Sequence, residues 1–434
     1  MDRLVSACPQ EAGSSLLRFF VCDDVRAALP GDRRFAGSGV PGSWRRPAVG
    51  GSTDAAPRGA APAPSRVPTR PPTFARMRVL LLVGTKRGLF SALSSPDRSR
   101  WELSDPMLVG HEVYHAVLDP RDGRTAWAAS AHKVWGAHMH RSGDAGRNWT
   151  VLEEAPHHAD ERGVAAVWQV APGHTAEPDV LYAGIEPAGL FVSRDRGASW
   201  QSVASLNEHP TTATWQPAGG ALALHSIAVD PRTPDWIWCA VSAGGTYRSE
   251  DHGATWSPLN RGVRADFLPR SLPDAGQCVH RLLFHPLRPD RLYQQNHCGT
   301  YRSDDRGEIW TEVTADLPSD FGYALALDPA DPDAAFVIPE ESSHMRTVAG
   351  GRLCVYGTRD AGASWHPLPR GLPQAHAYVT VLRDAFAADT LAPCGLYLGT
   401  SGGHLFASRD AGASWTLLAG YLPRILSVTA AVVD

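Results

Sequence analysis

The sequence has little lysine and no long hydrophobic run. Its lysines are Lys86 and Lys133, and arginine supplies the other 39 basic residues, a bias typical of a GC-rich genome. The longest apolar runs, residues 16–22 and 79–84, are far shorter than the ~20 residues that a membrane-spanning helix needs. Neither run has the layout of a signal peptide. We therefore expect a cytoplasmic protein that does not associate with a membrane.

Paired cysteines with metal-ligand spacing are also missing. The seven cysteines are an odd number and include no Cys-x-x-Cys pair. This excludes the common zinc motifs and argues against a disulfide framework. We expect free thiols in a reducing compartment, no metal and no cofactor.

The charge balance argues against nucleic acid as a partner. The formal net charge is −4. Residues 1–76 carry eleven Arg and six Asp or Glu, a balance of +5, which leaves −9 for the remainder. An acidic body of this kind is not typical of nucleic-acid-binding proteins. We expect a monomer.

The first 76 residues differ from the rest of the chain. They are rich in Pro, Gly, Ala, Arg and Ser, and they show no sustained hydrophobic periodicity. Such a composition cannot bury enough apolar surface to offset the entropy lost on ordering. We interpret residues 1–76 as a disordered or mis-annotated N-terminal extension, with Met77 as the true start. A disordered targeting or interaction tail is the alternative, and residues 77–434 form the folded domain.

One eight-residue pattern, Ser/Thr-x-Asp-x-Gly-x-x-Trp, recurs six times in that domain. Its aspartates are spaced by 51, 56, 54, 55 and 50 residues, and they are Asp144, Asp195, Asp251, Asp305, Asp360 and Asp410. A period near fifty residues indicates an array of equivalent structural units. The Asp and Ser/Thr side chains can bond the amides of a tight turn, and the Gly can supply a positive φ. We therefore interpret the six aspartates as structural, and we expect each Trp to pack into the sheet edge or the next blade.

Each unit carries four short strands, and the last two flank the motif. An apolar strand ends near Asp-Pro or His-Pro, and second and third strands lead into the motif, as in residues 225–249. This rhythm predicts an all-β fold, a single seven-bladed β-propeller of four-stranded antiparallel blades. Six blades carry the motif. We expect the seventh to join residues 79–103 to the C-terminal strand 424–434, which removes open edges.

The motif is known as the Asp box or BNR repeat, so residues 78–434 resemble the sialidase-like superfamily of propellers. Residues 113–122, 207–231, 262–269, 276–282 and 290–305 resemble bacterial BNR-repeat glycosyl hydrolases and exo-alpha-sialidase-like proteins. Related propellers include xyloglucan-degrading enzymes, the sortilin ectodomain and the photosystem II stability/assembly factor. This range means that the fold does not dictate the function.

The sialidase catalytic signature is missing. True sialidases carry a Phe/Tyr-Arg-Ile-Pro tetrapeptide and six blades. The nearest string here, Tyr421-Leu422-Pro423-Arg424, has another order. Sialic acid hydrolysis is therefore not expected.

We expect the site at the central channel mouth, on the face that holds the connections between blades and between second and third strands. Long segments gather there, at residues 204–224, 260–279 and 338–352. Loops elaborated on one face of a rigid scaffold commonly carry binding. The candidate catalytic carboxyl groups are Glu112, Glu186, Asp266 and Glu340. The candidate binding residues are His115, Trp168, Trp215, His225, His280, Asn296, His297, Tyr323 and Tyr378.

Alternative interpretations accompany these candidates. Each histidine can be a structural residue bonded to a neighbouring backbone. The set His115, His225, His280 and His297 could instead hold a metal, although no local ligand spacing supports it. For function, the first hypothesis is a propeller that binds and hydrolyses a carbohydrate, as the resemblance implies. The second is a non-catalytic propeller that binds a protein.

Overall fold

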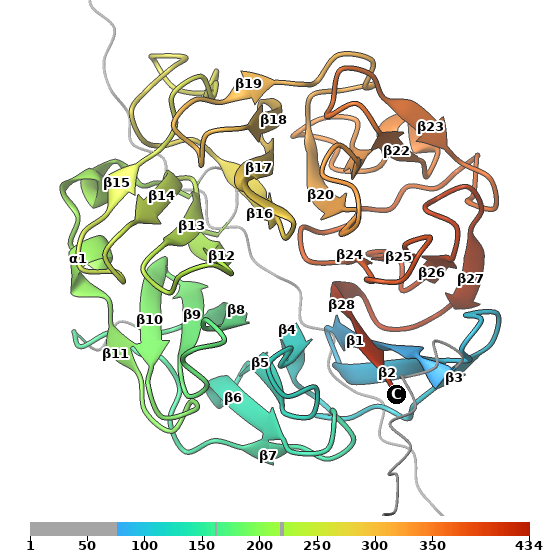
Figure 1. Cartoon of the computed structure of the whole chain (residues 1–434), viewed down its shortest axis with the longest axis horizontal. Helices are drawn as coiled ribbons and strands as arrows, with labels where there is room; N and C mark the ends of the chain where they lie inside the picture. The colour runs from blue at the N-terminus through green and yellow to red at the C-terminus, as the bar shows by residue number, and fades with distance from the viewer. Residues whose placement is uncertain (1–75, 161–162, 218–220) are drawn as a thin grey trace, which may run out of the picture. The chain divides into compact units, whose positions relative to one another are not determined.

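The computed structural model describes residues 76–160, 163–217 and 221–434, which belong to one compact unit. The expectation for residues 1–76 lies outside the described residues, apart from Arg76. The described part is a ring of seven four-stranded sheets around a central axis (Figure 1). The predicted seven-bladed all-β propeller is confirmed.

Each sheet is a blade, and in six of the seven the strands run in chain order from the axis outward. The six blades that carry the motif are β4 (Glu112–Leu118), β5 (Ala126–His132), β6 (Gly136–Ser142), β7 (Thr150–Val151); β8 (Ala166–Pro172), β9 (Leu181–Glu186), β10 (Gly189–Ser193), β11 (Gln201–Ser202); β12 (Ala223–Val229), β13 (Ile237–Ser242), β14 (Gly245–Ser249), β15 (Ser257–Pro258); β16 (Val279–His285), β17 (Arg288–Asn296), β18 (Gly299–Ser303), β19 (Thr311–Glu312); β20 (Gly322–Leu327), β21 (Ala335–Pro339), β22 (Val355–Thr358), β23 (His366–Leu368); and β24 (Phe386–Ala388), β25 (Leu396–Gly399), β26 (Leu405–Ser408), β27 (Thr416–Ala419). Helical turns are confined to connections, at α1 (Ala204–Asn207), η2 (Pro210–Thr214) and η3 (Ala349–Gly351). No helix among the described residues is long and apolar enough to cross a membrane.

The seventh blade joins the two ends of the domain. Its sheet order is β28 (Ile425–Val433), β1 (Arg78–Thr85), β2 (Gly88–Ser94) and β3 (Trp101–Leu103). Strand β28 pairs antiparallel with β1 from Arg78↔Val433 to Thr85↔Ile425. The predicted closure is therefore confirmed, and the C-terminal strand supplies the innermost position of this blade.

The six motif turns have the local geometry that the sequence predicts. In the β10–β11 turn, the Ser193 hydroxyl accepts from the Gly197 amide at 2.7 Å and donates to Asp195, while Asp195 accepts from the Ser199 amide at 2.9 Å. Gly197 has a φ of 82°. In the equivalent turn of the β20–β23 blade, hydrogen bonds from Ser364 lower the pKa of Asp360 to about 2. These aspartates bond their own turns, which agrees with a structural role.

Two of the motif tryptophans bond to the edge of the preceding blade. The Trp310 indole N–H donates to the Leu259 carbonyl at 2.9 Å, and Trp365 donates to Val313 at 2.7 Å. Each acceptor follows the outermost strand of the blade before. The expected position at a sheet edge is therefore seen for these two, but the neighbour is the preceding blade rather than the next one.

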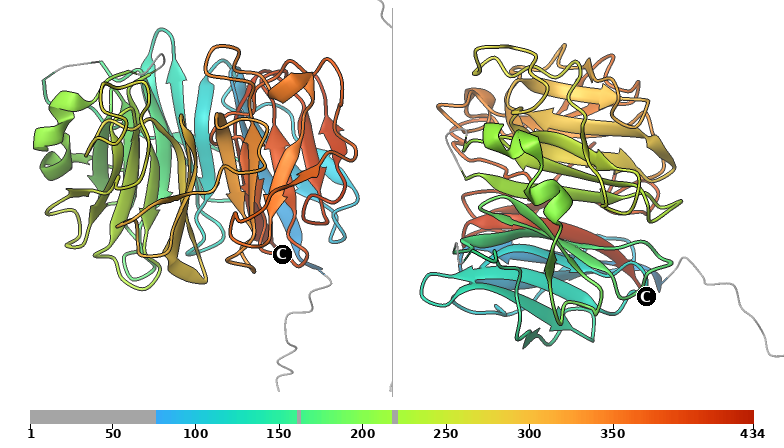
Figure 2. Two further views of the ribbon diagram at one scale, coloured as in Figure 1. Left: turned by 90° about the horizontal axis from the view of Figure 1, so that it is seen from above. Right: turned by 90° about the vertical axis from the view of Figure 1, so that its left-hand side faces the viewer.

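The antiparallel order places two kinds of loop on opposite ends of the blades (Figure 2). The motif turns lie beside the turns between first and second strands, as the hydrogen bond from the Arg196 amide to the Asp179 carbonyl at 2.9 Å shows. We call this end the turn face. The connections between blades, and those between second and third strands, form the opposite end, which we call the connection face.

Candidate functional site

A cavity of about 230 Å³ opens among the innermost strands toward the connection face. Its lining combines aromatic rings, arginines and one carboxylate, and consists of Tyr114, Trp168, Ala221, Tyr323, Arg346, Thr380, Leu382, Arg383, Asp384, Arg424 and Leu426. We call it the central cavity. It matches the predicted location, and it contains two of the predicted binding residues, Trp168 and Tyr323.

The aromatic walls come from first strands of three blades. Tyr114 lies on β4, Trp168 on β8 and Tyr323 on β20. The rings of Tyr114 and Trp168 meet edge to face with centroids 5.0 Å apart. First strands begin at the connection face, so residues early in these strands converge there although they are far apart in the sequence.

Arginines form a second part of the cavity wall. The Arg383 guanidinium lies 4.8 Å from the Trp168 ring centroid and 5.9 Å from that of Tyr323. Burial lowers the pKa of Arg383 below its ordinary value, and the nearby Asp384 carboxylate opposes this shift. Arg346 and Arg424 complete a cationic lining. Such a lining suits hydroxyl-rich or anionic ligands, because guanidinium groups offer several donors in fixed positions.

Asp384 is the carboxylate of the central cavity, and it is already paired. It is 3% exposed, and the Arg281 guanidinium forms an ion pair with it. The sequence analysis missed Arg346, Arg383, Asp384 and Arg424. They lie in irregular connections without a motif or period, so no local signal identified them.

Glu112 and Glu186 hydrogen-bond to two of the aromatic residues of the cavity wall. The Tyr114 hydroxyl donates to Glu112 at 3.1 Å, and the Trp168 indole donates to Glu186 at 2.9 Å. Burial raises the pKa of Glu112, but the hydrogen bond and charge of Lys86 outweigh it, so the pKa lies below its ordinary value. The structure thus brings two of the four candidate carboxyl groups into one network.

Glu340 is buried beneath the same face. Glu340 is 0% exposed, and neither of its carboxyl oxygens has a hydrogen-bond partner of normal geometry among the described residues. Burial raises its pKa to about 8, although the Val381 amide and the charges of Arg346 and Arg424 oppose the shift. Glu340 is therefore protonated at neutral pH.

The other candidates lie away from the central cavity lining. Asp266 forms an ion pair with Arg264. Trp215 is buried in the core between the β8–β11 and β12–β15 blades, where its indole donates to the Tyr247 hydroxyl at 2.8 Å. Asn296 is 0% exposed. Tyr378 is 62% exposed.

The four predicted histidines do not converge on one point. His225 is 0% exposed and bonds the Val279 carbonyl at 2.8 Å, which is the structural role that the sequence left open. His115 lines a second cavity, of about 510 Å³, whose walls continue to the turn face. His280 and His297 are neighbours, with ring centroids 5.8 Å apart.

A second histidine group, absent from the sequence expectations, lies on the β4–β7 blade. The His111 ring centroid is 5.2, 5.5 and 5.6 Å from those of His132, His138 and His140. The Ser130 hydroxyl bridges His111 and His140 at 3.1 and 2.8 Å. Burial, with the neighbouring histidines, lowers the pKa of His140 to about 4. The alternation of His138 and His140 on one strand was the available signal.

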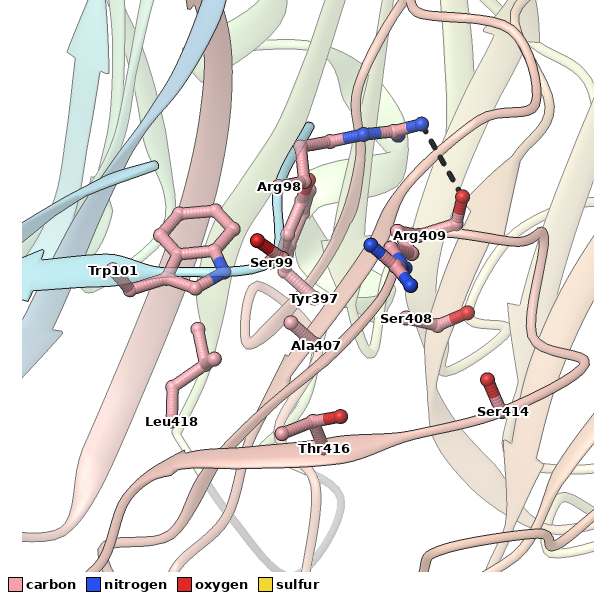
Figure 3. Close-up of a pocket in the computed structure, with 10 residues that line it drawn as sticks. All are labelled: Arg98, Ser99, Trp101, Tyr397, Ala407, Ser408, Arg409, Ser414, Thr416 and Leu418. Carbon is pink, nitrogen blue, oxygen red and sulfur yellow. Dashed lines mark hydrogen bonds between the residues drawn. The ribbon is translucent and has the colours of Figure 1, made fainter. Parts of the chain in front are cut away.

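A smaller pocket, of about 190 Å³, lies at the seam between the seventh blade and the β24–β27 blade (Figure 3). Trp101 on β3 meets Tyr397 on β25 edge to face, at 5.4 Å between centroids. The Arg98 guanidinium crosses the seam to the Arg409 carbonyl at 3.2 Å. This blade lacks a complete motif, but Arg98, directly after Asp97, has a φ of 56°, close to the 60° of Arg196 after Asp195.

Comparisons with known proteins give partial matches. The chain matches none of the protein-family models against which it was compared. It is 28% identical over 210 residues to a Neosartorya fischeri protein named a probable oligoxyloglucan-reducing end-specific xyloglucanase. That match covers 45% of this chain and 23% of the relative, so the chain corresponds to about a quarter of the relative's length.

Solved structures share the fold. A Bacteroides fragilis protein, provisionally assigned as a 6-phosphogluconolactonase, superposes with a TM-score of 0.50 and 11% identity, covering 84% of this chain and 100% of that protein. An ancestral GH74 enzyme gives a TM-score of 0.46 and 16% identity, covering 73% of this chain and 38% of that enzyme. The protein is thus a seven-bladed propeller with partial sequence similarity to xyloglucan-degrading enzymes.

Proposed function

We propose that this propeller binds a carbohydrate in its central cavity. The observation that carries the proposal is the lining itself, in which Tyr114, Trp168 and Tyr323 stand beside Arg346 and Arg383. Sugar rings stack their C–H faces on aromatic side chains, and their hydroxyls bond to charged and amide groups. A concave site with apolar walls and a few convergent polar groups is typical of small-ligand binding.

Sequence similarity supports the same class of ligand. The curated relative in Neosartorya fischeri is named for action on xyloglucan. The six motif turns have the hydrogen-bonding pattern that their sequence predicts, and we propose that they are Asp boxes of a sialidase-like propeller. An oligosaccharide of the xyloglucan type is therefore the first ligand to test.

Binding is better supported than hydrolysis. Most glycoside hydrolases use two carboxyl groups that flank the scissile bond. Asp384 is the carboxylate among the lining residues, and Arg281 holds it in an ion pair. Glu112 and Glu186 hydrogen-bond to Tyr114 and Trp168 but are not among the lining residues. Hydrolysis therefore needs its own readout in the experiment.

The experiment is calorimetric titration of the full chain with a panel of neutral and acidic oligosaccharides, followed by product analysis. We expect Trp168→Ala to weaken binding at least about 10-fold, equivalent to about 1.4 kcal/mol. Trp135→Ala is the matched control, because Trp135 is 72% exposed and lies outside the cavity lining. Failure of every oligosaccharide to bind, or equal affinity of the Trp168 variant, would contradict the proposal. Product formation that stops in Glu112→Gln or Glu186→Gln would add hydrolysis.

A protein ligand is the second candidate function. The β5–β6 turn exposes Val134 and Trp135, each at 72%, on the connection face. Exposed large apolar side chains of this kind occur at protein interaction sites. This alternative predicts that no oligosaccharide binds, and that Trp135→Ala, not Trp168→Ala, abolishes association with a partner.

A further inference from the structure

Three metal-ligand side chains meet on the β16–β19 blade, outside the central cavity lining. Cys278 directly precedes β16, His280 is the second residue of β16, and His297 lies in the turn between β17 and β18. One sulfur and two ring nitrogens lie within 4.8 Å of one another. We call these three residues the Cys–His–His cluster. Their spacing in the sequence, two and then seventeen residues, matches no local metal motif.

The hydrogen bonding of His280 leaves one ring nitrogen free to act as a ligand. Its Nδ1 lies 2.6 Å from the Gly322 carbonyl oxygen. A carbonyl only accepts hydrogen bonds, so Nδ1 carries the proton. Nε2 of the neutral ring then presents its lone pair toward Cys278, whose sulfur is 3.4 Å away. A backbone carbonyl that fixes the tautomer in this way is the usual support of a metal-ligating histidine.

The observed distances are close to those of a coordinated ion. With metal–sulfur and metal–nitrogen bonds of ~2.3 and ~2.0 Å, two ligands of one ion stand ~3.6 Å apart. The Cys278–His280 pair already lies at 3.4 Å. The whole cluster, within 4.8 Å, needs to contract by only about 1 Å at its widest pair. His297 is the least buried member of the cluster.

Most of the cluster is buried. Cys278 and His280 are 4% and 3% exposed. The partly buried His297 ring packs against Phe321 and against Phe267, which is 39% exposed, each with centroids 5.1 Å away. Two of the three ligands are therefore shielded from solvent, and His297 is the most accessible of the three.

Charge decides which ion fits. The guanidinium groups of Arg346 and Arg383 act electrostatically on both Cys278 and His280. A divalent ion with one thiolate carries a net charge of +1, which these arginines oppose. A monovalent ion with one thiolate is neutral. Thiolate and imidazole bind both Cu⁺ and Zn²⁺, so the positive charge of the surroundings is the feature that favours the monovalent ion.

We propose that Cys278, His280 and His297 bind one cuprous ion through Sγ and two ring nitrogens. The thiol of Cys278 gives up its proton to solvent as the sulfur–copper bond forms, and no electron is transferred. Three ligands complete a trigonal site, so the cluster needs no fourth side chain. No member of the cluster lines the central cavity, but the His280 ring packs against Tyr323 of that lining, with centroids 4.5 Å apart.

The test is anaerobic Cu⁺ titration of the full chain in competition with the chromophoric chelator bicinchoninate. We expect one equivalent to be retained by the wild type, with affinity at least about 100-fold higher than in Cys278→Ser or His297→Gln. The matched control is Cys298→Ser, because Cys298 is a neighbouring buried thiol that is not one of the three ligands. It should retain the wild-type affinity.

Thermal melting of each apo variant establishes that it folds. X-ray absorption of the copper-loaded wild type adds a readout that needs no variant, and we expect one sulfur and two nitrogen neighbours. The proposal fails if Cys278→Ser retains Cu⁺ like the wild type, if copper is surrounded by sulfur alone, or if Zn²⁺ displaces Cu⁺ from the cluster.

Discussion

Glu340 makes the stability of the propeller depend on pH in a way that one substitution removes. Burial raises its pKa from an ordinary 4.5 to about 8. Between these values the unfolded chain releases the proton while the native protein retains it, so stability falls as pH rises. At 1.36 kcal/mol per pH unit, the interval between these two pKa values corresponds to a loss of at most about 5 kcal/mol in the free energy of unfolding. Below pH 4.5 both states hold the proton, and above about 8 the loss levels off.

Glu340→Gln preserves the shape of the protonated acid but cannot ionise. We expect it to match the wild type near pH 4.5 and to be more stable by a few kcal/mol at pH 8, because its unfolded state can no longer be stabilised by releasing this proton. The free energy of unfolding, from urea denaturation at half-unit steps between pH 4.5 and 8.5, measures this difference directly. A constant difference between variant and wild type across that range would refute the reasoning. Glu341→Gln, at the adjacent and exposed position, is the control.

Three further predictions concern the repeats and the histidine group. Gly362→Ala should cost about 3 kcal/mol of unfolding free energy. Gly362 has a φ of +87°, and an added Cβ would lie 2.7 Å from a valine of the preceding blade. Gly143→Ala is the control and should be near neutral in the same denaturation experiment, because nothing lies within 4 Å of the added Cβ there. Trp310→Phe should cost about 1–2 kcal/mol, since the Leu259 carbonyl loses its 2.9 Å hydrogen bond, and an unchanged melting temperature would contradict this. His140→Gln should reduce the loss of stability as pH falls from 6.5 to about 4, because burial and neighbouring histidines lower the pKa of His140 to about 4 and the native ring resists protonation; parallel acid-denaturation curves for variant and wild type would count against it.

The fold could be predicted because its determinants are local and repeated. Each motif turn uses residues within eight positions, as in Ser193, Asp195 and Gly197, so its geometry follows from the sequence. The closure followed from counting strands, since residues 79–103 supplied only three strands of the seventh blade and the C-terminal residues supplied the fourth.

The site could be predicted only where it uses that regularity. Trp168 and Tyr323 occupy early positions in first strands, and the sequence placed them correctly at the cavity. Arg383 lies in an irregular connection and meets Trp168, more than two hundred residues earlier, through the closed ring. From its place in a long loop Trp215 resembled a surface residue, yet it is buried in the core, where its indole donates a hydrogen bond to the Tyr247 hydroxyl. Such contacts depend on three-dimensional packing, which no sequence period encodes.

The ring cannot close until the last strand of the chain has been synthesised. β1 is made first among the described strands, but its partner toward the axis is β28, made last. While the ribosome is still producing the intervening blades, the edge of β1 is unpaired, and apolar residues such as Leu81 and Val83 are not yet buried by the strands that later pack on them. Loss of the last ten residues would therefore remove the axial partner of β1 and also the contacts that β28 makes with β24 and β25 of the neighbouring blade.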